Sequence, residues 1–279
     1  MNKVEYRKDR SSLILSCLVY LSAALTALIL LYLIGYILYH GLPNLTLPGL
    51  FDLKYNSENQ SMTPAIINTL IITVLSLILA VPVGIFAAIY LVEYSKKGNF
   101  LVKIMRVTAE TLAGIPSIVY GLFGFIVFYI TLGWGYTLLS GVITLSIMIL
   151  PLIIRTTEEA LLSVPDSLRE GSFGLGAGKL RTVFKIVLPP AVPGILSGIV
   201  LSIGRILGES AALIFTSGTN PVTAHSLFSS ASTLSVHLYA LLTEGLYTEQ
   251  AYATAVVLLV LVVIINGLSA FLAKKIAAK

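Results

Sequence analysis

The sequence predicts an all-α integral membrane protein with six transmembrane helices. Of its 279 residues, 57% are hydrophobic and only 11% are charged, which leaves too little polar surface to cover a soluble globule of this size. The charges are clustered, so uncharged runs remain at residues 11–51, 59–92, 111–154 and 250–273. Each of these runs exceeds the ~20 apolar residues that one spanning helix needs.

The uncharged run at 111–154 is long enough for two helices, because Gly133 and Gly135 break it and Trp134 between them suits a membrane interface. The first segment is expected to be a retained anchor, since its apolar run is about twice as long as that of a cleaved signal peptide. We therefore expect six spans, at residues 13–39, 65–91, 112–130, 136–154, 192–215 and 251–272.

The distribution of positive charge predicts that both termini face the cytoplasm. In this orientation 16 of the 18 Lys and Arg residues lie inside, whereas Lys54 lies in an outer loop and Arg205 within the fifth helix. The net charge of +5 then reflects membrane orientation. Nucleic-acid binding is not expected, because the basic residues are spread over separate segments. The predicted cytoplasmic segments are 1–12, the segment between the second and third spans, 155–193 and 273–279, and the extracytoplasmic loops are 40–64 and 217–250.

The long polar loop between the fourth and fifth spans is unusual in so apolar a chain. A short amphipathic helix is expected at 167–173, with Asp166 as its cap after a break at Pro165. Leu168 gives this helix an apolar side and Glu170 a charged side. Such a helix can lie in a groove of a soluble partner. From the residues alone, a connector that folds back on its own helices is an equally good interpretation.

The same loop resembles the cytoplasmic motif of permease subunits of ATP-binding-cassette importers. That motif reads Glu-Ala-Ala, three residues, Gly, nine residues, Ile, any residue, Leu-Pro. This chain matches its spacing without a gap, and the small residues Gly171 and Ser172 replace the two alanines. In that family the loop forms the coupling helix that contacts the ATPase subunit. The resemblance therefore assigns this contact to Leu168, Arg169, Glu170, Gly171, Ser172, Gly176, Ile186, Leu188 and Pro189.

A nucleotide site within this chain is not expected. A phosphate-binding loop needs G-x-x-x-x-G-K-[ST], and the nearest stretch, at 174–180, has one residue too few between its glycines and Leu180 in place of the hydroxyl residue. The resemblance implies that ATP and magnesium are bound by a separate ATPase, with no cofactor in this chain. No metal site is expected either, since His40, His225 and His237 lack ligand spacing.

Arg205 lies about midway along the fifth helix, where a charge costs at least ~2.5–3.5 kcal/mol. Glu209 follows four positions later and is expected on the same helical face, where the two charges can neutralise each other. Alternatively, the guanidinium binds a tetrahedral oxyanion in a water-lined path. The residues leave both interpretations open. Gly194, Gly198, Gly204 and Gly208 of this helix have the spacing of close helix packing.

Two stretches resemble the phosphate-importer branch of the permease family. They are 204–212 and 114–121, and in the second Pro116 breaks the helix and Ser117 is expected to satisfy part of the freed backbone. The resemblance covers residues 65–272 and implies a permease core of five helices with the type I importer fold, in a bacterial or archaeal cytoplasmic membrane. It also implies that Arg205, Glu209 and Ser117 belong to the substrate pathway or gate.

The resemblance further implies three kinds of protein partner: a second, related permease, a homodimer of ATPases and an extracytoplasmic phosphate-binding protein. Two alternatives stay open. The cargo can be another oxyanion, such as sulfate, molybdate or tungstate, because an arginine does not separate oxyanions by itself. An integral membrane enzyme is the other class, with Glu209 and Arg205 as its best candidate residues, but one carboxylate without a base, metal or nucleophile does not build a reaction.

Overall fold

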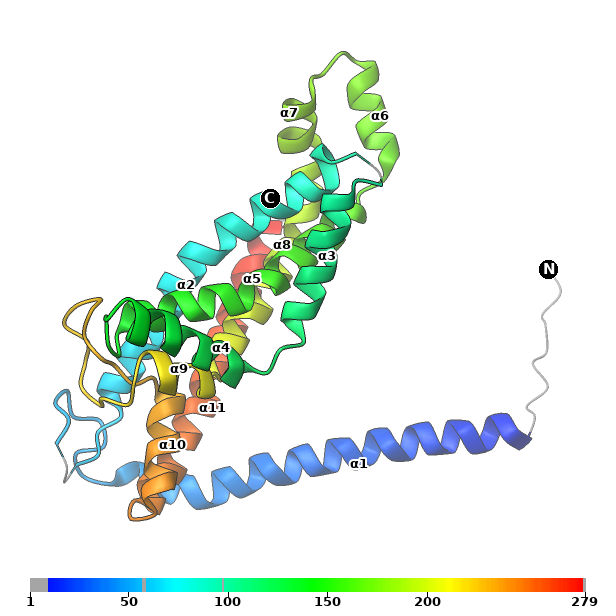
Figure 1. The fold of residues 1–279 in the computed structure, drawn as a ribbon. Helices are drawn as coiled ribbons and strands as arrows, with labels where there is room; N and C mark the ends of the chain where they lie inside the picture. The colour runs from blue at the N-terminus through cyan, green and yellow to red at the C-terminus, as the bar shows by residue number, and fades with distance from the viewer. Residues whose placement is uncertain (1–9, 57–58, 97, 278–279) are drawn as a thin grey trace.

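The structure is a computed structural model that describes residues 10–56, 59–96 and 98–277, so residues 1–9 and 278–279 of the predicted cytoplasmic ends lie outside it. Its described part is helical throughout (Figure 1). Five helices are long and apolar enough to cross a membrane, and a bent helix pair makes a sixth span. The predicted all-α membrane fold with six spans is thus confirmed. The spans are Ser12–Thr46, Thr63–Tyr94, Val102–Ala113 with Ser117–Thr131, Leu138–Leu162, Lys179–Leu207 and Thr248–Lys275.

The first helix, α1 (Arg10–Gly41), runs apart from the bundle along most of its length (Figure 1). It meets the last helix, α11 (Thr248–Ala277), near its own carboxyl end. There a Cβ at Gly41 would lie 2.5 Å from the carbonyl oxygen of Tyr252, so only glycine permits the approach. The His40 ring lies 4.2 Å from that of Tyr36 and 5.2 Å from that of Tyr252. α1 is therefore anchored to the bundle at one end.

The centre of the bundle is the packing of α2 (Thr63–Ile89) against α5 (Leu138–Leu162) and α8 (Leu188–Leu207). Its buried side chains include Ile72, Leu145 and Ile149. The Ser146 hydroxyl donates to the carbonyl oxygen of Ser76 at 3.2 Å, which satisfies a polar group between two helices. This core holds the other elements in place.

The third span is bent, and the two helices meet at the break expected at Pro116, near the start of the span predicted at 112–130. α3 (Phe100–Ala113) meets α4 (Ser117–Gly124) and its π-helical continuation η3 (Phe125–Thr131) at 101°. Pro116 is the N-cap of α4 with φ −58° and ψ 140°. Proline lacks an N–H and disfavours helical geometry in the residue before it, so the helix ends here rather than kinking.

The backbone freed by this bend is satisfied differently from the prediction. The Tyr120 hydroxyl donates to the carbonyl oxygen of Leu112 at 2.8 Å. Within the described residues, Ser117 forms no side-chain hydrogen bond that caps α4. Ser117 begins the helix instead, and the phenol one turn later reaches back across the break.

The fifth span is also broken, so the continuous helix predicted at 192–215 is wrong. α8 ends at Leu207, and α9 (Ala211–Thr216) follows after residues 208–210. Glu209 lies in this break, and its Oε1 accepts a hydrogen bond of 3.0 Å from the backbone N–H of Ala212. A side-chain acceptor beside Gly208 competes with the helical hydrogen bonds. The expected helical pairing of Arg205 with Glu209 is consequently not formed.

Of the four glycines predicted to allow close packing, Gly194, Gly198 and Gly204 approach neighbouring helices, whereas a Cβ at Gly208 would meet only its own helix. A Cβ at Gly194 would lie 2.7 Å from Cβ of Ala160, and one at Gly198 would overlap the side chain of Thr156, both on α5. A Cβ at Gly121 on α4 would lie 2.8 Å from Cα of Ala212 on α9. α4, the second half of the third span, thereby packs closely against the backbone of α9, the second half of the fifth span.

The extracytoplasmic end is closed by α10 (Leu234–Glu244) and the loops around it, at the end of the bundle opposite α6 (Figure 1). Asn68 of α2 holds the loop before α10: its Nδ2 donates to the carbonyl oxygens of Val222 and Ser232, and its Oδ1 accepts from the N–H of Ala224. Since this amide has all these partners within the fold, its burial is compensated.

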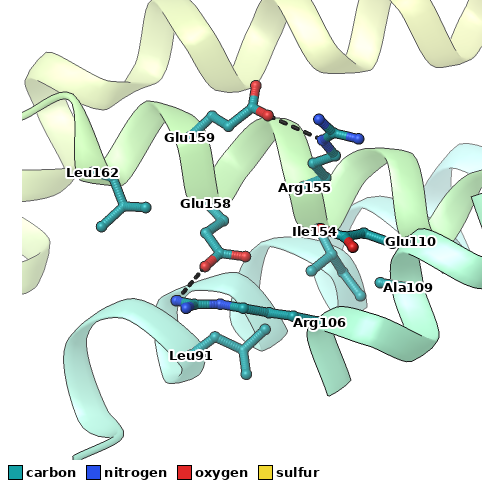
Figure 2. A pocket seen from close by; sticks show the side chains of 9 residues that line it. All are labelled: Leu91, Arg106, Ala109, Glu110, Ile154, Arg155, Glu158, Glu159 and Leu162. Atoms are coloured by element: carbon teal, nitrogen blue, oxygen red, sulfur yellow. Dashed lines mark hydrogen bonds and ion pairs between the residues drawn. The ribbon is translucent and has the colours of Figure 1, made fainter. Parts of the chain in front are cut away.

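At the other end, α5 continues beyond the predicted limit at 154 to Leu162. Figure 2 shows the cavity of about 260 Å³ that this extension forms with α3. Arg106 of α3 points to Glu158 of α5 and forms an ion pair of 2.5 Å, and Arg155 pairs with Glu159 at 3.0 Å within α5 (Figure 2). The first pair joins the bent span to the cytoplasmic end of the core.

Candidate functional site

The predicted amphipathic helix in the polar loop is α6 (Asp166–Gly174), which projects from the bundle together with α7 (Lys179–Thr182) (Figure 1). Its N-cap is Pro165, with ψ 137°, and no side chain caps it, so the prediction that Asp166 caps the helix is wrong. Asp166 lies in the first turn, where its Oδ1 accepts from Arg169 Nη1 at 3.1 Å.

Arg169 fixes the orientation of α6. Its Nη2 forms an ion pair of 2.8 Å with Glu93, which lies in η2 (Tyr90–Tyr94), the π-helical end of α2. In addition, Arg169 Nη1 donates to the carbonyl oxygen of Val164 at 2.7 Å, and Nη2 donates to that of Leu161 at 2.9 Å. The side chains of Arg169 and Glu93 are 14% and 8% exposed. The guanidinium of Arg169 thus points toward the protein interior and not toward solvent. Glu93 was not predicted, although an acid directly after the uncharged run at 59–92 was a signal for it.

The outer side of α6 is apolar and exposed. Leu168 and Phe173 are about half exposed, and Leu175 is 91% exposed. Glu170 and Gly171 are exposed on the same short helix. Large exposed apolar side chains outside the membrane spans indicate a protein-interaction surface. A groove of about 630 Å³ runs beside them between α6 and the following helices, and Arg181 and Lys185 line it.

Gly176 ends α6. Its φ is +80°, its N–H donates to the carbonyl oxygen of Phe173, and the N–H of Ala177 donates to that of Ser172. This is a Schellman motif, which requires a left-handed residue and therefore favours glycine. The Ser172 hydroxyl is buried and bonded to that of Thr182 at 2.8 Å. The motif glycine and the small residue before it thus shape the α6–α7 hairpin.

The end of the motif connects this hairpin to the core. The π-helical turn η4 (Val183–Val187) runs directly into α8, with Pro189 in the first turn of α8. Val183 and Val187 are buried, Leu188 packs partly buried against them, and Ile186 is 37% exposed. The hairpin is therefore continuous with the buried start of α8.

The second candidate site is a cavity of about 670 Å³ between α8, α11 and Leu152 of α5. Arg205 lines it, and within the described chain this arginine forms no ion pair. Neither Glu209 nor Ser117 lines this cavity. Asn266 lines it instead. This residue was not predicted from the sequence. It could have been, because a strongly polar side chain within an apolar membrane run, like Arg205, is costly and therefore indicates a function.

Comparison with solved structures shows the fold. A bacterial alginate ABC transporter, solved with an alginate pentasaccharide-bound periplasmic protein, matches 97% of this chain and 99% of its own with a TM-score of 0.67 and 18% identity. The MetNI methionine ABC transporter matches 76% of this chain and 93% of its own, with a TM-score of 0.60 and 20% identity. The chain therefore has the fold of the membrane-spanning subunits of these transporters.

Sequence comparison identifies the family. Residues 80–278 match the binding-protein-dependent transport system inner membrane component family, and the chain belongs to it. The probable ABC transporter permease protein YqgI of Bacillus subtilis is 32% identical over 88% of this chain and 89% of its own. The phosphate transport system permease protein PstA of Mycobacterium leprae is 38% identical over 72% of this chain and 67% of its own.

Proposed function

We propose that this chain is one of two membrane-spanning subunits of an ATP-driven, binding-protein-dependent importer of inorganic phosphate. The observation that carries the proposal is Arg205, whose guanidinium lines a membrane-embedded cavity without an ion pair among the described residues. Its planar fork matches the oxygens of a tetrahedral oxyanion. The relatives that are named phosphate permeases support phosphate as the anion.

The proposal implies the remaining subunits. A PstC-like permease completes the pathway, and a PstB-like ATPase homodimer binds ATP and magnesium. A PstS-like phosphate-binding protein docks on the outer loops at 40–64 and 217–250. Membrane lipid surrounds the spans, and nucleic acid has no part in the reaction. The transported phosphate crosses without a covalent step.

The ATPase contact is the exposed side of α6, where Leu168, Glu170 and Leu175 face outward. Apolar side chains of this kind supply affinity and charges fix the register. Arg169 does not belong to that contact. It connects α6 to Glu93, so a displacement of α6 moves the end of α2 together with the start of α8. Closure of the ATPase dimer would then rock the permease subunits as rigid bodies.

The test is phosphate uptake into proteoliposomes that hold the four-component transporter, with ATP on the cytoplasmic side. Glu170→Lys should abolish uptake and ATPase co-purification, whereas Glu159→Lys, a matched charge reversal at an exposed site on α5, should preserve both. Arg205→Gln should reduce uptake without loss of assembly. Uptake by this chain alone, or unaltered uptake by Arg205→Gln, would contradict the proposal. Preference for sulfate, molybdate or tungstate would change the cargo.

A further inference from the structure

Asn266 is a polar residue in an apolar helix. It belongs to α11, whose run at 250–273 carries no charge. Its Oδ1 is buried, and among the described residues it has no hydrogen-bond partner. A buried amide oxygen without a partner is unfavourable in a membrane, and polar residues retained there mark pathways or helix contacts.

Asn266 lies beside Gly204 and thus next to the Arg205 position. A Cβ at Gly204 would lie 3.3 Å from Asn266 Nδ2 and 3.5 Å from its Oδ1. Asn266 and Arg205 line the same cavity of about 670 Å³, together with Ser197 and several aliphatic side chains. The Arg205 cation and the Asn266 amide thus line one largely apolar space, as in sites that bind a small polar ligand, whereas the Ser197 hydroxyl donates to the carbonyl oxygen of Pro193.

The cavity leads toward the cytoplasm. A neighbouring cavity of about 350 Å³ shares Ser197, Val200 and Ala270 with the first, and Lys274 lines its far end. Along a helix, Lys274 lies about 12 Å beyond Asn266. A groove along the seam of α8 and α11 thus begins at one cation and ends at another. This arrangement attracts an anion at both ends.

An amide supplies what arginine lacks. A guanidinium offers only donors, whereas the Asn266 side chain offers a donor and an acceptor. Phosphate keeps at least one P–OH group at neutral pH, while sulfate, molybdate and tungstate are fully deprotonated. The P–OH group can donate to Oδ1. A deprotonated oxyanion can accept only from Nδ2 and leaves Oδ1 without a donor, so loss of the amide costs it little net binding free energy.

We propose that Asn266, together with Arg205, forms the oxyanion site of the pathway and determines its preference for protonated phosphate. This inference rests on the proposed function. Two other occupants fit the groove less well. A lipid chain would leave Arg205 and Asn266 without polar partners at its inner end. A donor from the second permease would satisfy Oδ1 but would not use Arg205.

The experiment measures equilibrium binding of radiolabelled phosphate, with sulfate as competitor, to the permease–ATPase complex in nanodiscs without the binding protein. In the wild-type complex, phosphate should bind at least tenfold more tightly than sulfate. Asn266→Leu should weaken phosphate binding about tenfold and leave sulfate binding unchanged, so that the preference disappears. Arg205→Gln should weaken the binding of both anions. Ser269→Ala, on the same helix outside the cavity, is the matched control.

Uptake assays in proteoliposomes separate the possible failures. If the wild-type complex takes up no phosphate, the proposed function fails. If uptake is normal but the preference survives in Asn266→Leu, or phosphate binding to the wild-type complex is undetectable, only the inference fails. Loss of the second permease on purification of Asn266→Leu, with equal weakening of both anions, would assign the amide to a helix contact. Altered lipid retention with unaltered anion binding would assign it to lipid.

Discussion

Arg169 and Glu93, which are 76 positions apart in the sequence, form an ion pair of 2.8 Å that joins α6 to the end of α2. Both side chains are largely buried, at 14% and 8% exposure. Burial makes this pair different from the exposed pair of Arg155 and Glu159, each 63% exposed.

Glu93→Gln should loosen α6. Removing one partner of a buried pair costs about 3–5 kcal/mol, because the other charge is left without compensation. Hydrogen exchange at residues 166–176 should accelerate, and ATP-driven uptake should fall. Glu159→Gln removes an exposed pair worth about 0–1 kcal/mol and serves as the control. Unchanged exchange in Glu93→Gln would show that the pair does not hold α6.

Gly176→Ala should strain the end of α6. The glycine has a φ of +80°, and a Cβ there would meet nothing within 4 Å, so the cost is that of the left-handed backbone alone, about 1–2 kcal/mol. Protease cleavage within 174–179 should become faster and uptake weaker. Gly174→Ala, in the helix with nothing within 4 Å, should instead stabilise it by about 0.5–1 kcal/mol. Equal behaviour of the two variants would argue against the Schellman motif.

Gly121→Ala should separate α4 from α9. The new Cβ would lie 2.8 Å from Cα and 3.0 Å from the carbonyl oxygen of Ala212, and a backbone cannot move aside as a flexible side chain can. Overpacking of this kind costs about 1–3 kcal/mol. The thermal unfolding midpoint of the purified complex should fall. Gly267→Ala, in α11 where a Cβ meets nothing within 4 Å, should not lower it. An unaltered midpoint for Gly121→Ala would contradict the close contact.

Glu209→Gln and Glu209→Leu should differ. Oε1 of Glu209 accepts from the N–H of Ala212, and glutamine keeps that acceptor. Leucine removes it, at a cost of about 0.5–2 kcal/mol for a lost helix cap. Uptake and thermal stability should therefore survive in Glu209→Gln and decline in Glu209→Leu. If the carboxylate instead neutralises Arg205, both variants will lose activity to the same degree.

His237 should make the extracytoplasmic cap sensitive to acid. Burial of its ring on α10 lowers the pKa of His237 below its usual 6.5, and the ring contacts Tyr55 edge-on at 6.3 Å. The unfolded cap then binds more protons than the folded one below pH 6.5, so stability is kept above this pH and lost as the pH falls further. The protection of amides at 59–62 against hydrogen exchange, after correction for the intrinsic rate at each pH, should fall between about pH 7.5 and pH 5.5. His237→Gln should abolish that difference, and its persistence would exclude His237 as the cause.

The breaks in the spans show where sequence patterns stop being sufficient. Pro116 identified a weak point in the third span, yet an apolar run has the same composition whether it is straight or bent by 101°. The bend depends on partners that the fold supplies, namely the Tyr120 hydroxyl on Leu112 and the backbone of α9 against Gly121. The break at 208–210 had no proline to mark it. There the helical spacing predicted that Glu209 pairs with Arg205. In the structure Glu209 instead accepts a hydrogen bond from the N–H of Ala212 at the start of α9.

The sequence by itself determined the class of protein, its six spans, their orientation and the place of the coupling motif. These properties follow from local hydrophobicity, charge position and fixed spacing, which act along the chain. Only the tertiary structure decided that Arg169 pairs with Glu93, that Glu209 turns away from Arg205, and that Asn266 joins Arg205 in one cavity. The first and the third depend on packing between segments distant in sequence, which no local pattern encodes, and the second depends on a helix break at 208–210 that no proline marks.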